Sequence, residues 1–204
     1  QMCIRDRYTY RRMKLIILFV VIASPSAADR CPLGPDHAYR LDEIIVELGI
    51  AHDPQVAGLL SQELWTLWLE APDATAQSML NEGMAHRETS DFISARDSLD
   101  ELVAYCPDYA EGYNQRAFAS FLDRDYDAAL VDLNKALEIM PNHIAALSGR
   151  GLTLMGLGRN GEGQEALRGA LALNPWLSER GLIIEPDGTD TVSYTHLTLP
   201  TNDL

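Results

Sequence analysis

The pattern of apolar and polar residues predicts helices through much of the chain. In the range 54–69, apolar side chains recur every three or four positions, which places them on one face of a helix: Leu60, Leu64 and Leu67. Asp53 and Pro54 mark the start of this helix, because an aspartate caps free N–H groups and proline fits the first turn. Residues 41–48 form a second run, in which apolar residues are interspersed with acidic ones. Together the two runs predict a helical hairpin.

Beyond residue 72 the pattern repeats with a period of 34 residues. Three prolines lie 34 positions apart, at Pro107, Pro141 and Pro175. One aligned column contains only small residues: Gly83, Ala117 and Gly151. A second small column is followed four positions later by leucine: Ala95, Ala129 and Gly163. Because small side chains let helices cross closely and proline ends a helix, each unit predicts two closely packed helices.

This repeat resembles the tetratricopeptide repeat, a helix–turn–helix unit of the same period. The resemblance covers residues 76–177. The third unit departs from the pattern, because Asn160 stands where Phe92 and Tyr126 stand in the first two. The resemblance implies an all-α solenoid that binds another molecule and does not catalyse a reaction.

We expect one small domain built from successive helical pairs. Three repeats should occupy 73–175. The hairpin within 29–72 should be a degenerate first unit that caps the stack, because the end unit of a solenoid must present a polar outer face. Apolar groups within 176–190 should cover the other end.

The ends of the chain differ in character from this domain. One DNA string, read in opposite orientations, encodes both QMCIRDR at the start and TVSYTHL at 191–197, and it resembles the transposase adapter used to prepare sequencing libraries. We therefore expect 1–12 and 191–204 to be artefact. Residues 13–28 have the order of a secretory signal: a lysine, an apolar run and then small residues. This order predicts a periplasmic or secreted protein that is not inserted in the membrane after cleavage.

The chain is acidic, with 30 Asp and Glu against 16 Lys and Arg and a net charge of −14. Two of those acidic residues and five of the basic ones lie outside 29–190, so the expected mature chain has 28 against 11, a net charge of −17. Such a charge repels nucleic-acid phosphates and anionic lipids, and neither is an expected partner. We interpret the acidity as a solvated surface in preference to a receptor for a cationic partner.

Two cysteines remain in the expected mature chain, Cys31 and Cys106. In an oxidising compartment they predict a disulfide. The alternative is two free thiols, with Cys106 packed beside Pro107.

The sequence contains no catalytic, metal or cofactor motif that we recognise. Its histidines are scattered, without the helical pair of a zinc protease. The glycine-rich range 156–163 lacks the strand and lysine of a phosphate loop, so it predicts a turn between helices. Asp123, Asp125 and Asp127 alternate as in a calcium loop but lack its glycine and closing glutamate. We therefore expect neither an enzyme nor a cofactor.

The resemblance also implies a binding face, because the first helix of each tetratricopeptide unit lines a concave groove. A stripe with spacing i, i+4, i+7 on these helices comprises Leu80, Met84, Arg87, Asn114, Phe118, Phe121, Ser148, Leu152 and Met155. The subfamily that clamps a C-terminal carboxylate has Lys, Asn and Arg on this stripe, whereas here it is mostly apolar. The stripe therefore predicts a groove for an apolar peptide or helix of an unknown protein.

Two other interpretations of the stripe remain open. Helix packing could bury Phe118 and Phe121, or the tail of the chain could fold into the groove. The functional prediction is an exported interaction module or scaffold. The alternative is a structural subunit of an envelope assembly that self-associates, as a homo-oligomer, through the groove.

Overall fold

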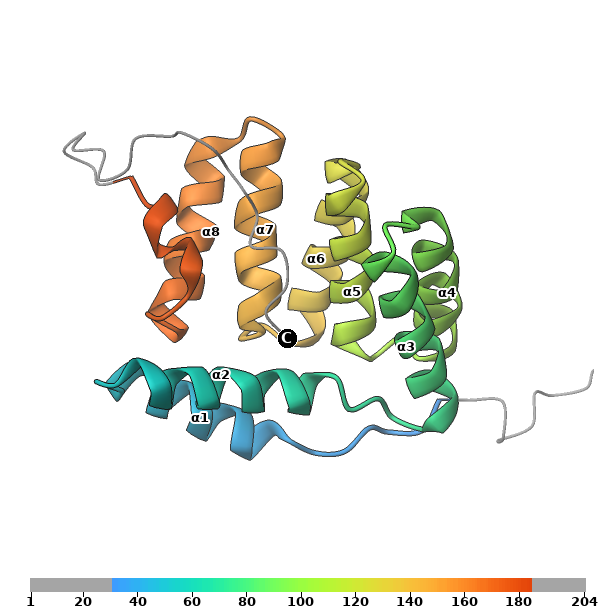
Figure 1. The fold of residues 1–204 in the computed structure, drawn as a ribbon, viewed down its shortest axis with the longest axis horizontal. Helices are drawn as coiled ribbons and strands as arrows, with labels where there is room; N and C mark the ends of the chain where they lie inside the picture. The colour runs from blue at the N-terminus through green and yellow to red at the C-terminus, as the bar shows by residue number, and fades with distance from the viewer. Residues whose placement is uncertain (1–30, 185–204) are drawn as a thin grey trace, which may run out of the picture.

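The computed structural model describes residues 31–184, and within them all regular structure is helical (Figure 1). The elements are α1 (Ala38–Ile50), α2 (Pro54–Trp68), α3 (Ala74–Glu88), α4 (Phe92–Tyr105), α5 (Ala110–Leu122), α6 (Tyr126–Ile139), α7 (Ile144–Gly156), α8 (Asn160–Leu173) and the 3-10 helix η2 (Ser178–Leu182). The expected signal peptide and both expected artefact segments lie outside the described residues. No helix within 31–184 has the length and apolar character needed to cross a membrane.

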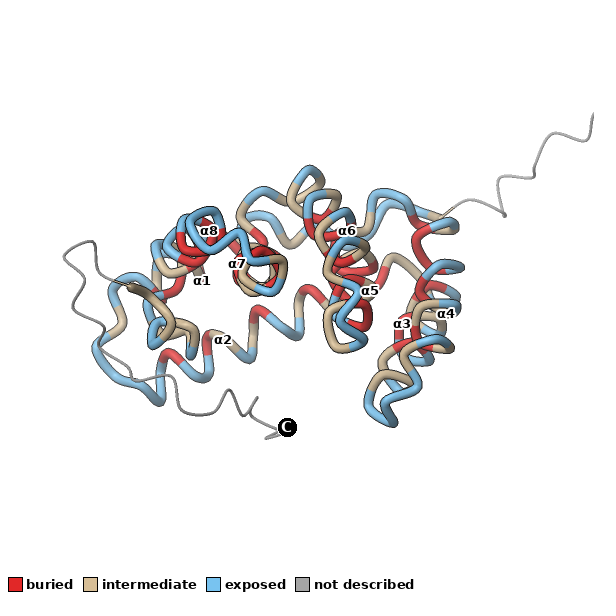
Figure 2. The backbone as a smooth tube through the Cα atoms, turned by 90° about the horizontal axis from the view of Figure 1, so that it is seen from above, coloured by how far each residue is buried: buried red, intermediate tan, exposed pale blue. Residues whose placement is uncertain are grey.

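The predicted solenoid of three helix pairs is confirmed. Helices α3 and α4, α5 and α6, and α7 and α8 form three hairpins that stack side by side (Figure 1). Figure 2 shows buried residues concentrated where these helices face one another. The small residues of the repeat lie where the helices of a pair cross. A Cβ atom added at Gly151 would lie 2.6 Å from Cγ of Leu167, and one at Gly83 would lie 2.5 Å from Cγ of Leu99.

The turn inside each hairpin uses one residue in the left-handed region of the backbone. These residues are again 34 positions apart, with φ of 62° at Ser90, 63° at Arg124 and 76° at Gly158. Glycine adopts this conformation without steric cost, whereas other residues adopt it less readily. The glycine-rich range around Gly158 therefore contains the predicted turn between two helices. Aspartate side chains accept backbone N–H bonds at the start of α4 and α6.

The N-terminal hairpin lies in a different place from the predicted one. α1 and α2 do not stack in front of α3, and they cross the ends of the repeat helices, under the loops that join one unit to the next (Figure 1). Their buried face packs against the start of α7, the end of α8 and the region after it, including Ile144, Leu173 and Trp176. A hairpin stacked on α3 would leave these three apolar side chains in water. Burying them provides the physical reason for the observed position.

The described part of the tail, residues 176–184, lies on α8 and the hairpin. Trp176 and Leu177 pack against the same cluster as α1 and α2. Farther along, the amide of Gln164 on α8 donates to the carbonyl of Leu182 at 2.7 Å and accepts from the N–H of Ile184 at 2.9 Å. Arg168 of α8 also donates to the carbonyl of Ile184 at 2.7 Å, so two side chains of α8 hold the tail on the third repeat.

Candidate functional site

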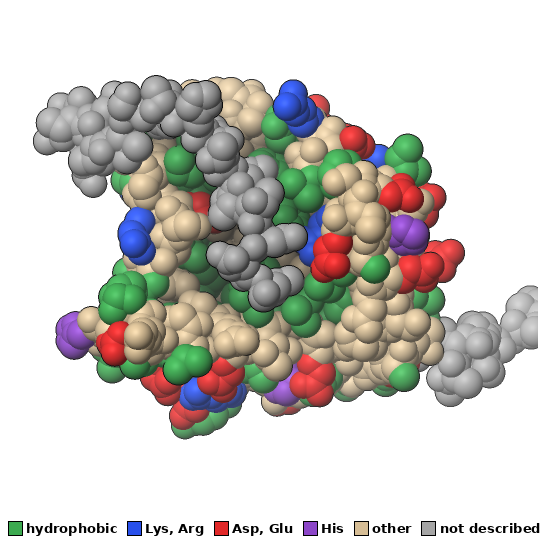
Figure 3. All heavy atoms as spheres, viewed as in Figure 1, with side chains coloured by type: hydrophobic (Ala, Val, Ile, Leu, Met, Phe, Trp, Pro, Cys, Tyr) green, Lys and Arg blue, Asp and Glu red, His purple; other side chains and the backbone are tan. Residues whose placement is uncertain are grey.

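The first helices of the three repeats, α3, α5 and α7, form one row, and each contacts the next. Figure 3 shows hydrophobic side chains gathered in the middle of this face, between α7 and α5. Rows of this kind arise because every unit repeats the same turn and the same crossing angle. The predicted groove corresponds to this row, and the side chains of the row define the candidate site.

The apolar side chains of the predicted stripe differ in accessibility. Phe118 on α5 is 44% exposed, the highest value among the stripe residues. The others that could contact a partner are partly buried: Met84, Phe121, Leu152 and Met155. The ring of Phe121 also contacts that of Tyr126, with centroids 5.4 Å apart, and packs against the core between the second and third repeats. Helix packing therefore partly buries Phe121 and leaves Phe118 accessible.

Three stripe residues are inside the protein. Leu80 is fully buried and packs with Leu99 and Leu102 between α3 and α4, so in this structure it is not available to a partner. Asn114 is 6% exposed and Ser148 is 4% exposed. The assignment of Leu80 is corrected for a physical reason: it lies one helical turn before Gly83, on the face that meets α4.

A buried polar cluster under the stripe was missed by sequence reasoning. The carboxylate of Glu111 accepts hydrogen bonds from the side-chain amides of Asn114 and Gln115. Its other neighbour is Nε2 of His143, at 2.8 Å. Nδ1 of His143 accepts from the N–H of Ala146 at 3.3 Å, which leaves the proton on Nε2 to be donated to Glu111. Of these residues the periodic stripe marks Asn114 alone, and no spacing marks Glu111 and His143, because they meet through the packing of α5 on the start of α7.

The two charged side chains at the centre of this cluster are closed to solvent. The side chains of His143 and Glu111 are 0% and 1% exposed. Within 31–184 there is no group of three or more His, Cys, Asp and Glu side chains that could hold a metal ion.

Arg87 brings a positive charge to the apolar stripe. Its guanidinium lies over the ring of Phe118, 4.5 Å from the centroid, which is the geometry of a cation–π contact. Burial lowers the pKa of Arg87, and the nearby charges of Glu88 and Glu111 partly oppose that effect. Its Nε atom is buried without a hydrogen-bond partner, and so is Oγ of Ser148 on α7. The stripe thus contains polar atoms that the described chain does not satisfy.

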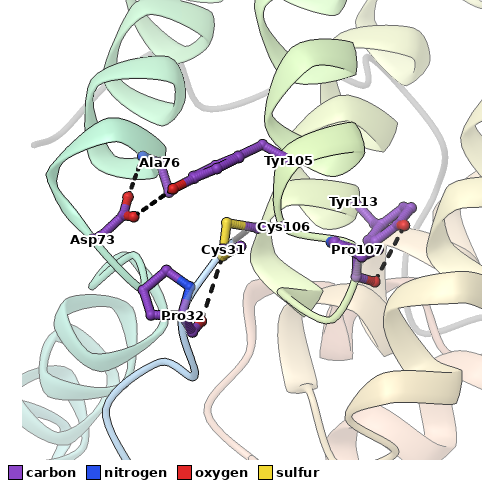
Figure 4. Close-up of a disulfide and its surroundings, with 8 residues drawn as sticks. All are labelled: Cys31, Pro32, Asp73, Ala76, Tyr105, Cys106, Pro107 and Tyr113. Atoms are coloured by element: carbon purple, nitrogen blue, oxygen red, sulfur yellow. Dashed lines mark hydrogen bonds between the residues drawn. A yellow bond between two sulfur atoms is a disulfide. The ribbon is translucent and has the colours of Figure 1, made fainter. Parts of the chain in front are cut away.

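Cys31 and Cys106 are joined in a disulfide with their Cα atoms 5.0 Å apart, inside the range that a disulfide requires (Figure 4). Cys106 is the C-cap residue that follows α4, and Cys31 lies at the start of the segment that leads to α1. Beside them, Asp73 accepts hydrogen bonds from the N–H of Ala76 at 2.8 Å and the hydroxyl of Tyr105 at 2.7 Å. The bond ties the segment before the hairpin to the first repeat.

That segment also borders a cavity of about 610 Å³. Its walls are residues 31–38, the end of α2 and the loops 104–111 and 139–143. No lysine or arginine lines it. No sequence pattern predicts this cavity, because it depends on where the hairpin docks.

Sequence comparison relates the chain to named repeat proteins, although no family model matches it. A TPR repeat-containing protein of Rhizobium etli is 32% identical over 147 residues, which are 72% of this chain and 67% of the relative. The tetratricopeptide repeat protein 36 homolog of Nematostella vectensis is 40% identical over 65 residues, which are 32% of this chain and 36% of the relative.

Solved structures with the same fold are similar to half of the chain. The TPR domain of OM64 from Arabidopsis has a TM-score of 0.52 and 24% identity, over 53% of this chain and 89% of that domain. The first TPR of Spaghetti (RPAP3), in a structure bound to the HSP90 peptide SRMEEVD, has a TM-score of 0.51 and 22% identity, over 52% of this chain and 83% of that one. With the repeat period, the stacked helix pairs and the Rhizobium etli relative, these similarities establish that the chain belongs to the tetratricopeptide repeat family.

Proposed function

We propose that this protein is an exported interaction module whose row of first helices binds an apolar peptide or helix of another protein. The observation that carries the proposal is the accessibility of Phe118, which is 44% exposed in a row of partly buried apolar side chains. An aromatic ring exposed at the centre of an apolar patch is typical of a protein-binding surface. On α7 the two apolar stripe residues, Leu152 and Met155, are less accessible than Phe118 because they are partly buried.

A peptide is the ligand class that family membership favours. The first TPR of Spaghetti binds a peptide of HSP90, and its fold is similar to that of this chain. The stripe here is mostly apolar, which favours an apolar segment over a chain terminus rich in carboxylates. Apolar side chains at helical spacing in a partner would fill a groove of this kind.

Export is part of the proposal, and two features support it. Residues 13–28 have the order of a secretory signal. Cys31 and Cys106 lie at disulfide distance, and disulfides persist in oxidising compartments. Fractionation of the producing cells, with the protein followed by antibody, tests this half of the proposal. Protein that remains in the cytoplasm with free thiols would contradict it.

Two groove variants test the binding half. Phe118→Asp and Leu152→Asp place a charge in the apolar stripe and should abolish capture of a partner in pull-down from envelope extract, with unchanged helical circular dichroism. Val131→Asp is the matched control, because Val131 is 69% exposed on α6, outside the row. It should capture the partner as the wild type does. If both groove variants unfold, these residues are core and the groove is not the site.

A further inference from the structure

The groove contains a partly buried guanidinium, that of Arg87, with one buried N–H group that has no acceptor among residues 31–184. Arg40, Arg96, Arg116 and Arg159 each pair with a carboxylate within 4.0 Å. Arg87 is partly buried, is in no such pair among residues 31–184, and has a buried Nε atom that donates to no acceptor. The contact with the Phe118 ring at 4.5 Å compensates part of the lost hydration.

Burial of a guanidinium without a counter-ion is unfavourable, because water solvates a charge better than an apolar surface does. Arginine does not escape this cost by losing its proton, since it stays charged in proteins at physiological pH. The missing group is an acceptor with negative charge, and a carboxylate accepts the two parallel N–H bonds that a guanidinium offers. We therefore expect the groove to favour a ligand whose acidic side chain lies beside Arg87.

The charge of the whole chain limits how acidic that partner segment is. With a net charge of −14, the protein repels a polyanion at long range. A single carboxylate among apolar residues meets Arg87 while the rest of the segment covers Phe118 and the side chains of α7. Because α5 separates α3 from α7, the axes of these two helices lie about 20 Å apart. An extended segment of about six residues spans that distance.

We propose that the partner segment is an apolar stretch with one aspartate or glutamate, and that this carboxylate pairs with Arg87. The proposal rests on the proposed function, since it assigns the chemistry of the ligand for the same groove.

Selection of peptides from a random twelve-residue phage library on the oxidised full-length protein tests this, with counter-selection on Phe118→Asp. Enriched peptides should be apolar and share one acidic residue. The best peptide and its neutral counterpart, with Glu replaced by Gln or Asp by Asn, are then titrated by fluorescence anisotropy. The neutral peptide should bind the wild type about tenfold more weakly, the size of a charge-assisted contact in a groove.

Two variants complete a double-mutant cycle. On Arg87→Gln the two peptides should differ by less than about twofold, since the pairing group is gone. Arg124→Gln, at an exposed turn residue outside the row, should behave as the wild type. The peptide comparison on the wild type stands even if Arg87→Gln fails to fold.

The outcomes separate the two proposals. Apolar peptides without an acidic residue, or equal affinity of the acidic and neutral peptides for the wild type, overturn the role of Arg87 and leave the groove proposal intact. The role of Arg87 is also overturned if Arg87→Gln prefers the acidic peptide over the neutral one as strongly as the wild type does. If no peptide is enriched on the wild type over Phe118→Asp, the groove is not a peptide site and both proposals fail.

Discussion

The indole ring of Trp68 lies stacked on the imidazole of His143, with ring centroids 4.3 Å apart and planes inclined by 17°. Trp68 ends α2 and His143 caps α7, so the contact joins the N-terminal hairpin to the third repeat. The hydroxyl of Tyr109 donates to the carbonyl of Trp68 at 2.7 Å and adds a link to the second repeat. Residues distant in sequence thus hold the hairpin across the loops of the stack.

Trp68→Ala should destabilise the protein by about 3–5 kcal/mol, the cost of removing a buried aromatic side chain and leaving a cavity. Urea unfolding followed by circular dichroism measures this. Trp65→Ala is the matched control, because Trp65 is 41% exposed and contacts Trp68 edge-on. It should cost much less. Equal costs would show that the hairpin docks in another way.

Arg116→Ala should destabilise by about 3 kcal/mol, because it leaves the buried carboxylate of Asp132 unpaired. The guanidinium of Arg116 donates to both oxygens of Asp132, at 2.8 and 2.6 Å, and this pairing raises the pKa of Arg116. Asp132 is 8% exposed, whereas the Arg96–Asp123 pair is more open. Arg96→Ala should therefore cost less than about 1 kcal/mol. Thermal unfolding of both variants, compared with the wild type, decides whether burial sets the difference.

Asp73 should make stability depend on pH. The N–H of Ala76 and the hydroxyl of Tyr105 lower its pKa. A carboxyl with a lowered pKa contributes stability above its unfolded pKa, near 4, and loses that contribution as the pH falls through the folded value. Asp73→Asn should be less stable than the wild type at pH 7, and the difference should shrink below about pH 4. Urea midpoints across this range measure it, and a difference independent of pH would contradict the assignment.

Two glycines of the third repeat should respond oppositely to alanine. Gly169 lies inside α8 with no atom within 4 Å of an added Cβ, so Gly169→Ala should stabilise by about 1 kcal/mol. At Gly151 the added Cβ would lie 2.6 Å from Cγ of Leu167 and 3.1 Å from the carbonyl oxygen of Gly163. Gly151→Ala should therefore destabilise by forcing α7 and α8 apart. Chemical unfolding of the two variants compares them directly.

Sedimentation velocity tests the alternative function, self-association. On the proposed function the protein should remain monomeric at high concentration, because a groove that pairs with an acidic segment has no matching partner in a second copy of the same groove. A dimer that dissociates in Phe118→Asp would favour the structural subunit. A dimer unchanged by that substitution would place the contact elsewhere, with the exposed Val46 and Ile50 of α1 as candidates.

The repeat units could be predicted because their signals are local and periodic. Proline and the small residues at Gly83 and Gly151 determine where each helix ends and where two helices cross. The docking of α1 and α2 could not be predicted, since an apolar stripe shows that a face is buried but not which surface covers it. Leu80 was misplaced for a related reason, because the groove face and the core face of α3 meet at its position. The Glu111–His143 contact joins residues without any common spacing.

The disulfide closes a loop of chain between positions 31 and 106, a sequence separation of 75. A pulling force on the two ends of the chain would be transmitted through that bond. The residues inside the loop, roughly 260 Å of chain if fully extended, would therefore not be stretched. α5 to α8 would then carry the tension and unravel, while the hairpin and the first repeat kept their length. A partner bound along the row would lose its contacts with α7 before those with α3. Under tension the groove would therefore open from the α7 end.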